Sequence, residues 1–182
     1  PVSPCSFALG ANATFVARAV DTQQKHMPGV LKRAHAHQGA SFVEIYTNCI
    51  VYNDAVFSSF AEKGTAADGT LALEHGHPMI FGKDNDKGIR MKSDTLELEV
   101  VQLGVDGTTE SDLLVHDETN HVMAVLLAGM HNPDFPVAIG VLYCEPAQSY
   151  DTAVREQITT AVAANADADM NSLLRSGATW TV

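Results

Sequence analysis

One short segment in the first third of the chain most constrains how it can fold. Residues 42–46 read Phe-Val-Glu-Ile-Tyr, a run rich in β-branched and aromatic side chains, and the polar residues Thr47 and Asn48 follow it, with Cys49 next. Such a run is typical of a buried β-strand. In open α/β sheets, ligands are held at the carboxyl ends of the strands. We therefore regard Cys49 as a candidate for chemistry rather than for packing.

The residues before this segment predict a strand and a helix that would complete a βαβ unit. Residues 14–18 form a compact strand candidate. A helix is expected from apolar residues that recur at helical spacing, namely Met27, Val30, Leu31 and Ala34. Gly39 then supplies a residue that tolerates the left-handed conformation at a helix end. Strand, helix and strand imply an α/β fold with parallel strands.

The residues after Asn53 predict a mixture of short elements. Strands are expected at 71–73, 79–81, 96–100 and 135–143. Helices are expected at 121–130, 149–165 and 170–175. The alternation of apolar and polar residues along 96–100 breaks between Val100 and Val101, which predicts either a β-bulge or a strand that passes between two environments.

The composition excludes several classes of protein. The 182 residues are 46% hydrophobic and 18% charged, which is typical of a globular chain. The net charge of −11 argues against nucleic acid as a partner, because phosphate binding depends on a high density of Lys and Arg. No apolar run reaches the roughly 20 residues needed to cross a bilayer, so no membrane partner is expected.

The cysteines and the first residue suggest where the chain comes from. Cys5, Cys49 and Cys144 lie far apart and form no CxxC pair. Reduced thiols in the cytoplasm are therefore expected rather than a disulfide framework. The chain opens on Pro1 instead of Met, and we expect it to be a piece of a longer polypeptide.

Several segments together resemble the β subunits of 2-oxoacid:ferredoxin oxidoreductases, and most closely those of the 2-oxoglutarate branch. The first group of matching segments comprises Ala8–Arg18, Phe42–Cys49 and Tyr52–Asn53. The second group comprises His75–Gly82, Lys87–Arg90, Leu114–Asp117 and Leu174–Val182. The likeness covers nearly the whole chain but corresponds to the C-terminal half of the family's subunit.

The resemblance implies a specific chemistry for the complete enzyme. Members of this family decarboxylate a 2-oxoacid on thiamine diphosphate held with Mg²⁺. They pass the electrons through a [4Fe-4S] cluster to ferredoxin and release an acyl-CoA. The implied partners are an α subunit, the N-terminal half of the β subunit, ferredoxin, coenzyme A and the 2-oxoacid. The implied assembly is a heterodimer of α and β subunits, and the cytoplasmic location expected from the cysteines is compatible with it.

The resemblance assigns one residue of this chain to that chemistry. Cys49 matches the fourth cysteine ligand of the [4Fe-4S] cluster, which makes it a metal ligand. The family's other three cysteines and its Gly-Asp-Gly motif for the diphosphate would lie upstream, so no catalytic or thiamine-binding residue is assigned. Residues 1–50 would close the thiamine-diphosphate-binding domain, and residues 51–182 would form the C-terminal extension. The isolated chain is then expected to be inactive.

Two other functions stay open from the residues alone. On a strand, His75 and His77 would point to the same face because side chains alternate, and His116, His121 and His131 could add ligands to a metal-dependent enzyme. No HExxH motif supports that interpretation, and the alternative is that these histidines pack or line the active site of the complete enzyme. The chain could also be a non-catalytic module that covers a partner subunit. In either case Cys49 would be a small packed residue, as most cysteines beside strands are.

Overall fold

The computed structural model describes residues 2–166, 169–178 and 180. They fall into two compact units, which divide between Ala147 and Gln148 and are described separately. No helix in the described part of the chain is both long enough and apolar enough to cross a membrane.

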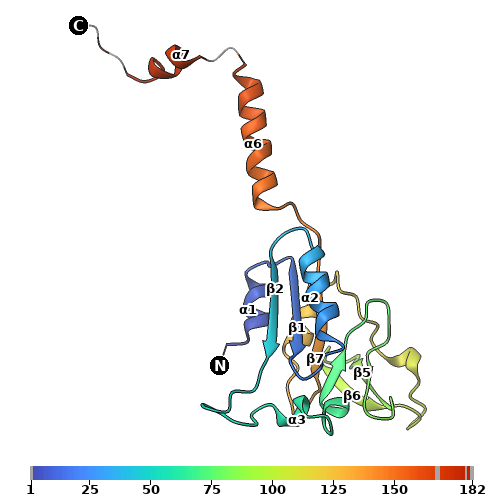
Figure 1. Cartoon of the computed structure of the whole chain (residues 1–182). Coiled ribbons are helices and arrows are strands. Elements are labelled where there is room, and N and C mark those ends of the chain that lie inside the picture. The colour runs from blue at the N-terminus through green and yellow to red at the C-terminus, as the bar shows by residue number, and fades with distance from the viewer. Residues whose placement is uncertain (1, 167–168, 179, 181–182) are drawn as a thin grey trace. The chain divides into compact units, whose positions relative to one another are not determined.

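The first unit contains the predicted βαβ unit. Strand β1 (Phe15–Val20), helix α2 (Met27–Ala36) and strand β2 (Ser41–Tyr46) follow one another, and the two strands pair in parallel (Figure 1). Pro28 occupies the first turn of α2, where its missing N–H costs nothing. Gly39 has φ of 122°, a conformation that an L side chain rarely adopts, and the chain reverses there toward β2.

A four-stranded sheet with the order β2-β1-β7-β3 organises this unit. Strand β7 (Val137–Cys144) runs antiparallel to β1, and β3 (Thr70–Ala72) runs parallel to β7. Because β7 and β3 complete the sheet that β1 and β2 begin, residues 1–50 and 51–147 form one compact unit. The α/β class with parallel strands is confirmed, while the division after residue 50 stays a prediction about two parts of a larger subunit.

A second sheet of three antiparallel strands lies beside the first. It consists of β4 (Ile80–Phe81), β5 (Lys87–Met91) and β6 (Leu98–Gln102) in that order. The predicted bulge in β6 is wrong, since β6 pairs with β5 in unbroken register. Strand β6 is an edge strand that is partly exposed along its length, so apolar side chains at 100 and 101 fit regular positions on its two faces. The register shift occurs instead between Val16 and Ala17, where β1 meets β7.

Short helices cover the ends and faces of these sheets. They are α1 (Pro4–Gly10), α3 (Ser58–Ala61), α4 (Ala66–Gly69), the 3₁₀ helix η1 (Glu110–Asp112) and α5 (His121–Ala128). The Asn120 side chain caps the first turn of α5 by accepting from the Met123 amide. Helix α5 begins at the predicted residue but ends two residues early, at Ala128, with Gly129 as its C-cap.

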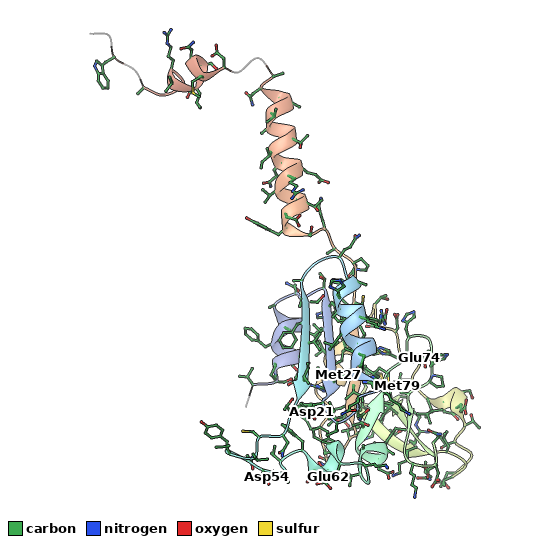
Figure 2. The ribbon with its side chains drawn as sticks, in the orientation of Figure 1. Asp21, Met27, Asp54, Glu62, Glu74 and Met79 are labelled. Atoms are coloured by element: carbon green, nitrogen blue, oxygen red, sulfur yellow. The ribbon has the colours of Figure 1, made fainter. Side chains whose placement is uncertain are left out.

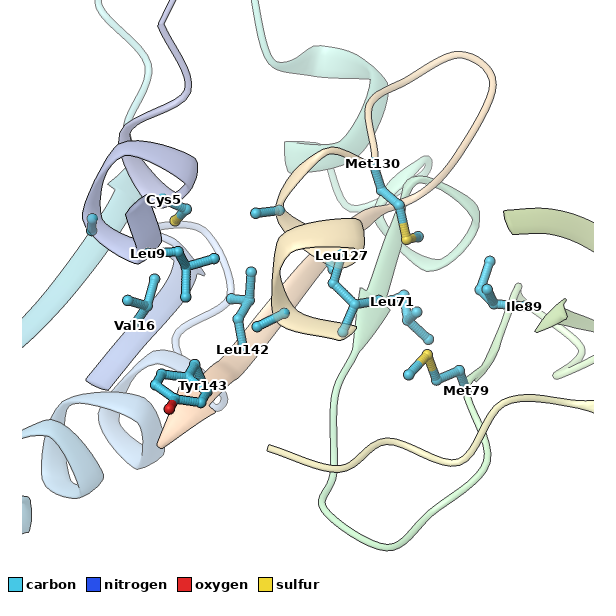
Figure 3. Close-up of a cluster of buried hydrophobic side chains, with 14 of the residues drawn as sticks. Cys5, Leu9, Val16, Leu71, Met79, Ile89, Leu127, Met130, Leu142 and Tyr143 are labelled. Atoms are coloured by element: carbon cyan, nitrogen blue, oxygen red, sulfur yellow. The ribbon is translucent and has the colours of Figure 1, made fainter. Parts of the chain in front are cut away.

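The main core lies between α1, α5 and the four-stranded sheet and extends to the second sheet (Figure 3). All six residues of β1 are buried, and seven of the eight residues of β7 are buried. The buried side chains labelled in the close-up are Cys5, Leu9, Val16, Leu71, Met79, Ile89, Leu127, Met130, Leu142 and Tyr143.

Strand β2 differs from the expectation of a buried strand. None of its six residues is buried, and Ile45 is 41% exposed. The sequence is apolar enough for the interior of a sheet, but β2 is the outermost strand of its sheet and has one neighbouring strand only in the described unit. Position in the sheet, rather than the residue pattern, therefore sets its burial.

The second unit contains two helices, as predicted. Helix α6 runs from Tyr150 to Ala164, and α7 runs from Met170 to Leu174. Asp169 caps α7 by accepting from the Ser172 amide at 2.7 Å. Neither helix buries a residue, so the apolar side chains along α6, which include Ile158 and Val162, are exposed.

Candidate functional site

The candidate site is the loop that follows the carboxyl end of β2. Three aromatic rings hold its two ends together: Tyr46 at the end of β2, and Phe57 and Phe60 beyond the loop. The ring centroids of Tyr46 and Phe57 are 4.8 Å apart, and those of Tyr46 and Phe60 are 5.2 Å apart. Tilted and edge-on contacts at these distances are favourable. The loop therefore leaves and rejoins the body of the unit at one aromatic cluster.

Residues 48–55, which we call the thiol loop, are also braced internally. The Asn48 side-chain amide donates to Asp54 Oδ1 at 2.8 Å. The Ala55 amide donates to Asn48 Oδ1 at 3.0 Å and to Asp54 Oδ1 at 2.9 Å. The Asn53 amide donates to the Cys49 carbonyl at 3.1 Å, and these two residues form an isolated β-bridge. A closed set of hydrogen bonds thus defines the conformation in which Cys49 is presented.

The three thiols lie in different environments. Cys49 is exposed on the thiol loop, whereas Cys5 is buried and Cys144 is half-buried. Burial raises the pKa of Cys5 to about 12, and burial also raises the pKa of Cys144. Since the thiolate is the form that binds metals, Cys49 is the thiol best placed to serve as a ligand. Cys5 and Cys144 fit the packing role that the sequence gives them.

A cleft of about 870 Å³ opens beside the thiol loop. Asp54 and Glu62, which are labelled in Figure 2, both line the cleft. Further lining residues come from the turn after β1, from the loop and from α3 and α4: Thr22, Gln23, Asn48, Ala55, Phe57, Ser58, Ala61, Lys63, Ala66 and Ala67. The cleft is therefore at the carboxyl edge of β1 and β2, where open α/β sheets hold ligands.

A buried ion pair supports β2 from within the sheet. Arg18 Nε donates to Glu44 Oε2 at 2.7 Å, and only 1% of the Arg18 side chain is exposed. The Arg18 guanidinium also lies 5.5 Å from the centre of the Tyr46 ring, and Cys5 Sγ donates to Glu44 at 3.2 Å. These contacts connect the centre of the sheet to the strand that carries the thiol loop.

The predicted pairing of His75 and His77 on one strand face is wrong. Both lie in the turn between β3 and β4, and both are more than half exposed. His77 Nδ1 lies 3.2 Å from Glu74, while His75 Nδ1 accepts from the Glu118 amide. His116 is buried, and its Nε2 lies 2.8 Å from the Val141 carbonyl.

Among the described residues, no group of three His, Cys, Asp or Glu side chains could hold a metal ion. Two acidic groups do lie close to His75 and His77, but each imidazole meets a single carboxylate rather than a set of converging ligands. The arrangement gives the histidine-based metal enzyme no support. His75 connects the turn to residues 117 and 118, whereas the His77 side chain contacts Glu74 within the same turn.

The sequence identified Cys49 but not its supporting residues. Asn48 and Asp54 are polar residues at either end of the apolar run Ile50–Tyr52, a pattern that could have indicated a braced loop. The three aromatic residues are too widely spaced to indicate a cluster without the fold. Arg18 and Glu44 pair because β1 and β2 place them opposite each other in register, which the sequence does not specify.

Comparison with known proteins gives a consistent family of relatives. Along its full length the chain is 32% identical to the 2-oxoglutarate oxidoreductase subunit KorB of Mycobacterium tuberculosis, of which the match covers 49%. It is 34% identical over 59 residues to the β subunit of 2-oxoacid:ferredoxin oxidoreductase 1 of Aeropyrum pernix, covering 32% of this chain and 19% of that protein. These matches confirm the resemblance described above, and the chain spans about half the length of the curated relative that it matches throughout. No family model matches the chain.

A solved structure confirms the fold. The chain resembles the 2-oxoglutarate:ferredoxin oxidoreductase of Magnetococcus marinus with a TM-score of 0.60 and 18% sequence identity. The likeness covers 98% of this chain and 45% of the other. That enzyme was solved with 2-oxoglutarate, coenzyme A and succinyl-CoA bound. At this identity the likeness shows the shared α/β fold.

Proposed function

We propose that this chain is the C-terminal half of the β subunit of a 2-oxoacid:ferredoxin oxidoreductase that acts on 2-oxoglutarate. The observation that carries the proposal is its 32% identity, over its full length, to a 2-oxoglutarate oxidoreductase subunit. In this proposal residues 1–50 close the thiamine-diphosphate-binding domain, and residues 51–182 form the extension that follows it. The chain by itself would then be inactive.

Cys49 is the residue that we assign to a cofactor. Its exposed thiol stands on a braced loop, and one thiolate of the usual four for a [4Fe-4S] cluster fits that position. The thiol loop contains one cysteine, so the other ligands would come from the rest of the subunit. When bound, such a cluster supplies electron transfer in single-electron steps.

The chain's own residues have three roles in this proposal. Cys49 would bind iron through its sulfur, which the exposed position of the side chain leaves accessible. Asn48 and Asp54 hold the loop in one conformation, so that little conformational entropy would be lost when the cluster binds. The aromatic cluster formed by Tyr46, Phe57 and Phe60 fixes the loop to the sheet.

The complete enzyme would need components that this chain does not provide. We propose thiamine diphosphate and Mg²⁺ as its further cofactors, because the relatives are named as 2-oxoacid oxidoreductases. We also propose an α subunit, the N-terminal half of the β subunit and ferredoxin as protein partners, with coenzyme A and the 2-oxoacid as substrates. The proposed setting is a heterodimeric enzyme of the cytoplasm.

The Cys49→Ser substitution in the complete subunit tests the assignment. A serine hydroxyl is a poor iron ligand, so we expect loss of most cluster iron and acid-labile sulfide, and a large drop in ferredoxin reduction. Cys144→Ser serves as the matched control, because it also removes one thiol but lies on β7. Unchanged iron content, visible absorbance and ferredoxin reduction in Cys49→Ser would remove Cys49 from the site.

The isolated chain provides an independent test. Purified 182-residue protein should contain neither iron nor thiamine diphosphate after anaerobic incubation with both, because one thiol cannot hold a cluster. Iron analysis and fluorimetric thiamine analysis measure the two contents. Stoichiometric binding of either cofactor would contradict the proposed division of the site between two halves of a subunit.

A further inference from the structure

The half-buried thiol of Cys144 lies beside an imidazole ring. Cys144 is the last residue of β7, where it pairs with Phe15, the first residue of β1, and packs at the margin of a small core. Its Sγ lies 3.8 Å from Nδ1 of His37, the residue that follows α2, so the thiol can donate a weak hydrogen bond to the ring. The contact is at the amino end of β1, whereas the thiol loop follows the carboxyl end of the parallel strand β2.

The His37 ring is held in a defined orientation. Its Nε2 lies 3.0 Å from Thr14 Oγ1, and the ring packs on Phe15 with a centroid distance of 5.3 Å. Gly39 covers this hydrogen bond closely, since a Cβ there would lie 2.8 Å from Thr14 Oγ1 and 3.0 Å from His37 Nε2. When Nε2 donates its proton to the Thr14 hydroxyl, Nδ1 faces the thiol as a proton acceptor.

Two charged residues complete the surroundings of the thiol. Arg33 donates to both carboxylate oxygens of Glu118 at 2.7 and 2.6 Å, and the Cys144 amide donates to the Glu118 carbonyl at 2.7 Å. Burial and the Glu118 carboxylate raise the pKa of the Cys144 thiol, while the Arg33 guanidinium lowers it. The resting thiol is therefore protonated and needs a base when it reacts. Burial lowers the pKa of His37, so its ring is neutral and can accept that proton.

We propose that Cys144 is a modification site at which a hydroperoxide oxidises the thiol to a sulfenic acid, with His37 as general base and Thr14 as the residue that positions the base. A thiol, a base within reach and a third group that orients the base are the parts of an activated nucleophile. A hydroperoxide fits the site because it is small enough to reach a half-buried thiol. It is also uncharged, whereas the net charge of −11 disfavours anionic oxidants.

The oxidation needs no reactant besides the peroxide. His37 Nδ1 takes the thiol proton while the sulfur attacks one peroxide oxygen, and the O–O bond breaks. The departing oxygen then takes the proton from the imidazole, so the thiol and hydrogen peroxide give a sulfenic acid and water. The sulfur loses two electrons and the peroxide gains them. A sulfenic acid condenses with thiols and can be reduced again, so the modification is reversible.

The probe is hydrogen peroxide, added to the purified 182-residue chain together with dimedone, which traps sulfenic acids. Peptide mass spectrometry measures the rate of trapping at Cys144 separately from the other two cysteines. His37→Gln removes the base and should slow the oxidation of Cys144 at least about 10-fold. His35→Gln is the matched control, because it removes an exposed histidine of α2 and should leave the rate unchanged. Circular dichroism checks the folding of each variant.

Substitutions at Thr14 test the positioning role. Thr14→Val keeps the shape but loses the hydroxyl and should slow the oxidation of Cys144 about 5-fold, whereas Thr14→Ser should restore the rate. In urea, where the contacts are lost, wild type and His37→Gln should be oxidised at the same rate. No trapping at Cys144 in the folded wild type would overturn the proposal. Equal rates in folded wild type and His37→Gln, or a difference that persists in urea, would do the same.

Discussion

The centre of the sheet and the thiol loop place the same kind of side chain, a cysteine thiol, in two different environments. In the centre, the Cys5 thiol is enclosed with Arg18 and Glu44, and burial keeps it protonated. In the thiol loop, Cys49 is exposed, and hydrogen bonds within the loop define the conformation in which it is presented. The difference shows that the fold encloses one thiol and leaves another accessible.

Thiol modification should show the largest difference between the two regions. The pKa of Cys5 is raised to about 12 by burial, so at pH 9 roughly one molecule in a thousand carries the reactive thiolate. Because Cys49 is exposed while Cys5 is enclosed and its thiolate is scarce, Cys49 should react with iodoacetamide at least about 100-fold faster than Cys5 in the folded chain. Peptide mass spectrometry measures both rates. In urea the two alkylation rates should become similar. Similar rates already in the native protein would mean that Cys5 is not enclosed.

Breaking the buried ion pair should destabilise the centre of the sheet strongly. Arg18→Ala leaves Glu44 without its charge partner and opens a cavity, so we expect the free energy of unfolding to fall by about 3–5 kcal/mol. The control is Arg33→Ala, which removes a partly exposed pair with Glu118 and should cost less than about 1 kcal/mol. Urea denaturation measures both. Equal losses would show that burial does not distinguish these two pairs.

The pH dependence of stability offers a further probe of the interior. Burial lowers the pKa of His116, so the folded state favours the neutral imidazole. The contribution of His116 is therefore present above its unfolded pKa of about 6.5 and is lost as the pH falls below that value. His116→Gln should flatten part of the decline in unfolding free energy between pH 7 and pH 5. The exposed residue His35 provides the control, and a decline that His35→Gln reduces equally would argue against His116 as its source.

The smallest expected effect concerns the brace of the thiol loop. Asp54→Ala removes the acceptor shared by the Asn48 side chain and the Ala55 amide. Because the loop is exposed, we expect the free energy of unfolding to fall by about 1 kcal/mol or less. The amides of residues 53 and 55 should exchange faster by hydrogen–deuterium exchange. Asp84→Ala, in an exposed polar turn, should leave those amides unchanged.

The sequence predicted much of the local structure, and it singled out Cys49 as a candidate ligand, which stays a prediction. Periodicity located α2 and α6, and β-rich runs located β1, β2 and β7. It failed where tertiary position decides: β2 reads as an interior strand because its side chains are apolar, but sheet order places it at an edge. The register shift also lies in a different strand from the predicted one. It occurs between Val16 and Ala17 of β1, where β1 pairs with β7, and not in β6.

The site could be predicted only in part for a similar reason. Cys49 stands out because a polar cluster follows a strand, and that signal is local in sequence. The sequence predicts His75 and His77 on one face of a strand only if the residues around them are extended. Gly76, between them, has φ of 78° and belongs to a turn, so that prediction fails. The cleft depends on α3 and α4 folding back toward Thr22 and Gln23, and no local pattern encodes that approach.

The most direct test is alkylation of Cys49 in the complete subunit, prepared without oxygen. A thiolate bound to iron does not act as a nucleophile, so we predict that Cys49 resists iodoacetamide while the visible absorbance of the cluster persists, and reacts once a chelator removes the iron. Peptide mass spectrometry reads the modification, and absorbance reads the cluster. Full alkylation of Cys49 with the cluster still intact would contradict its assignment as a ligand.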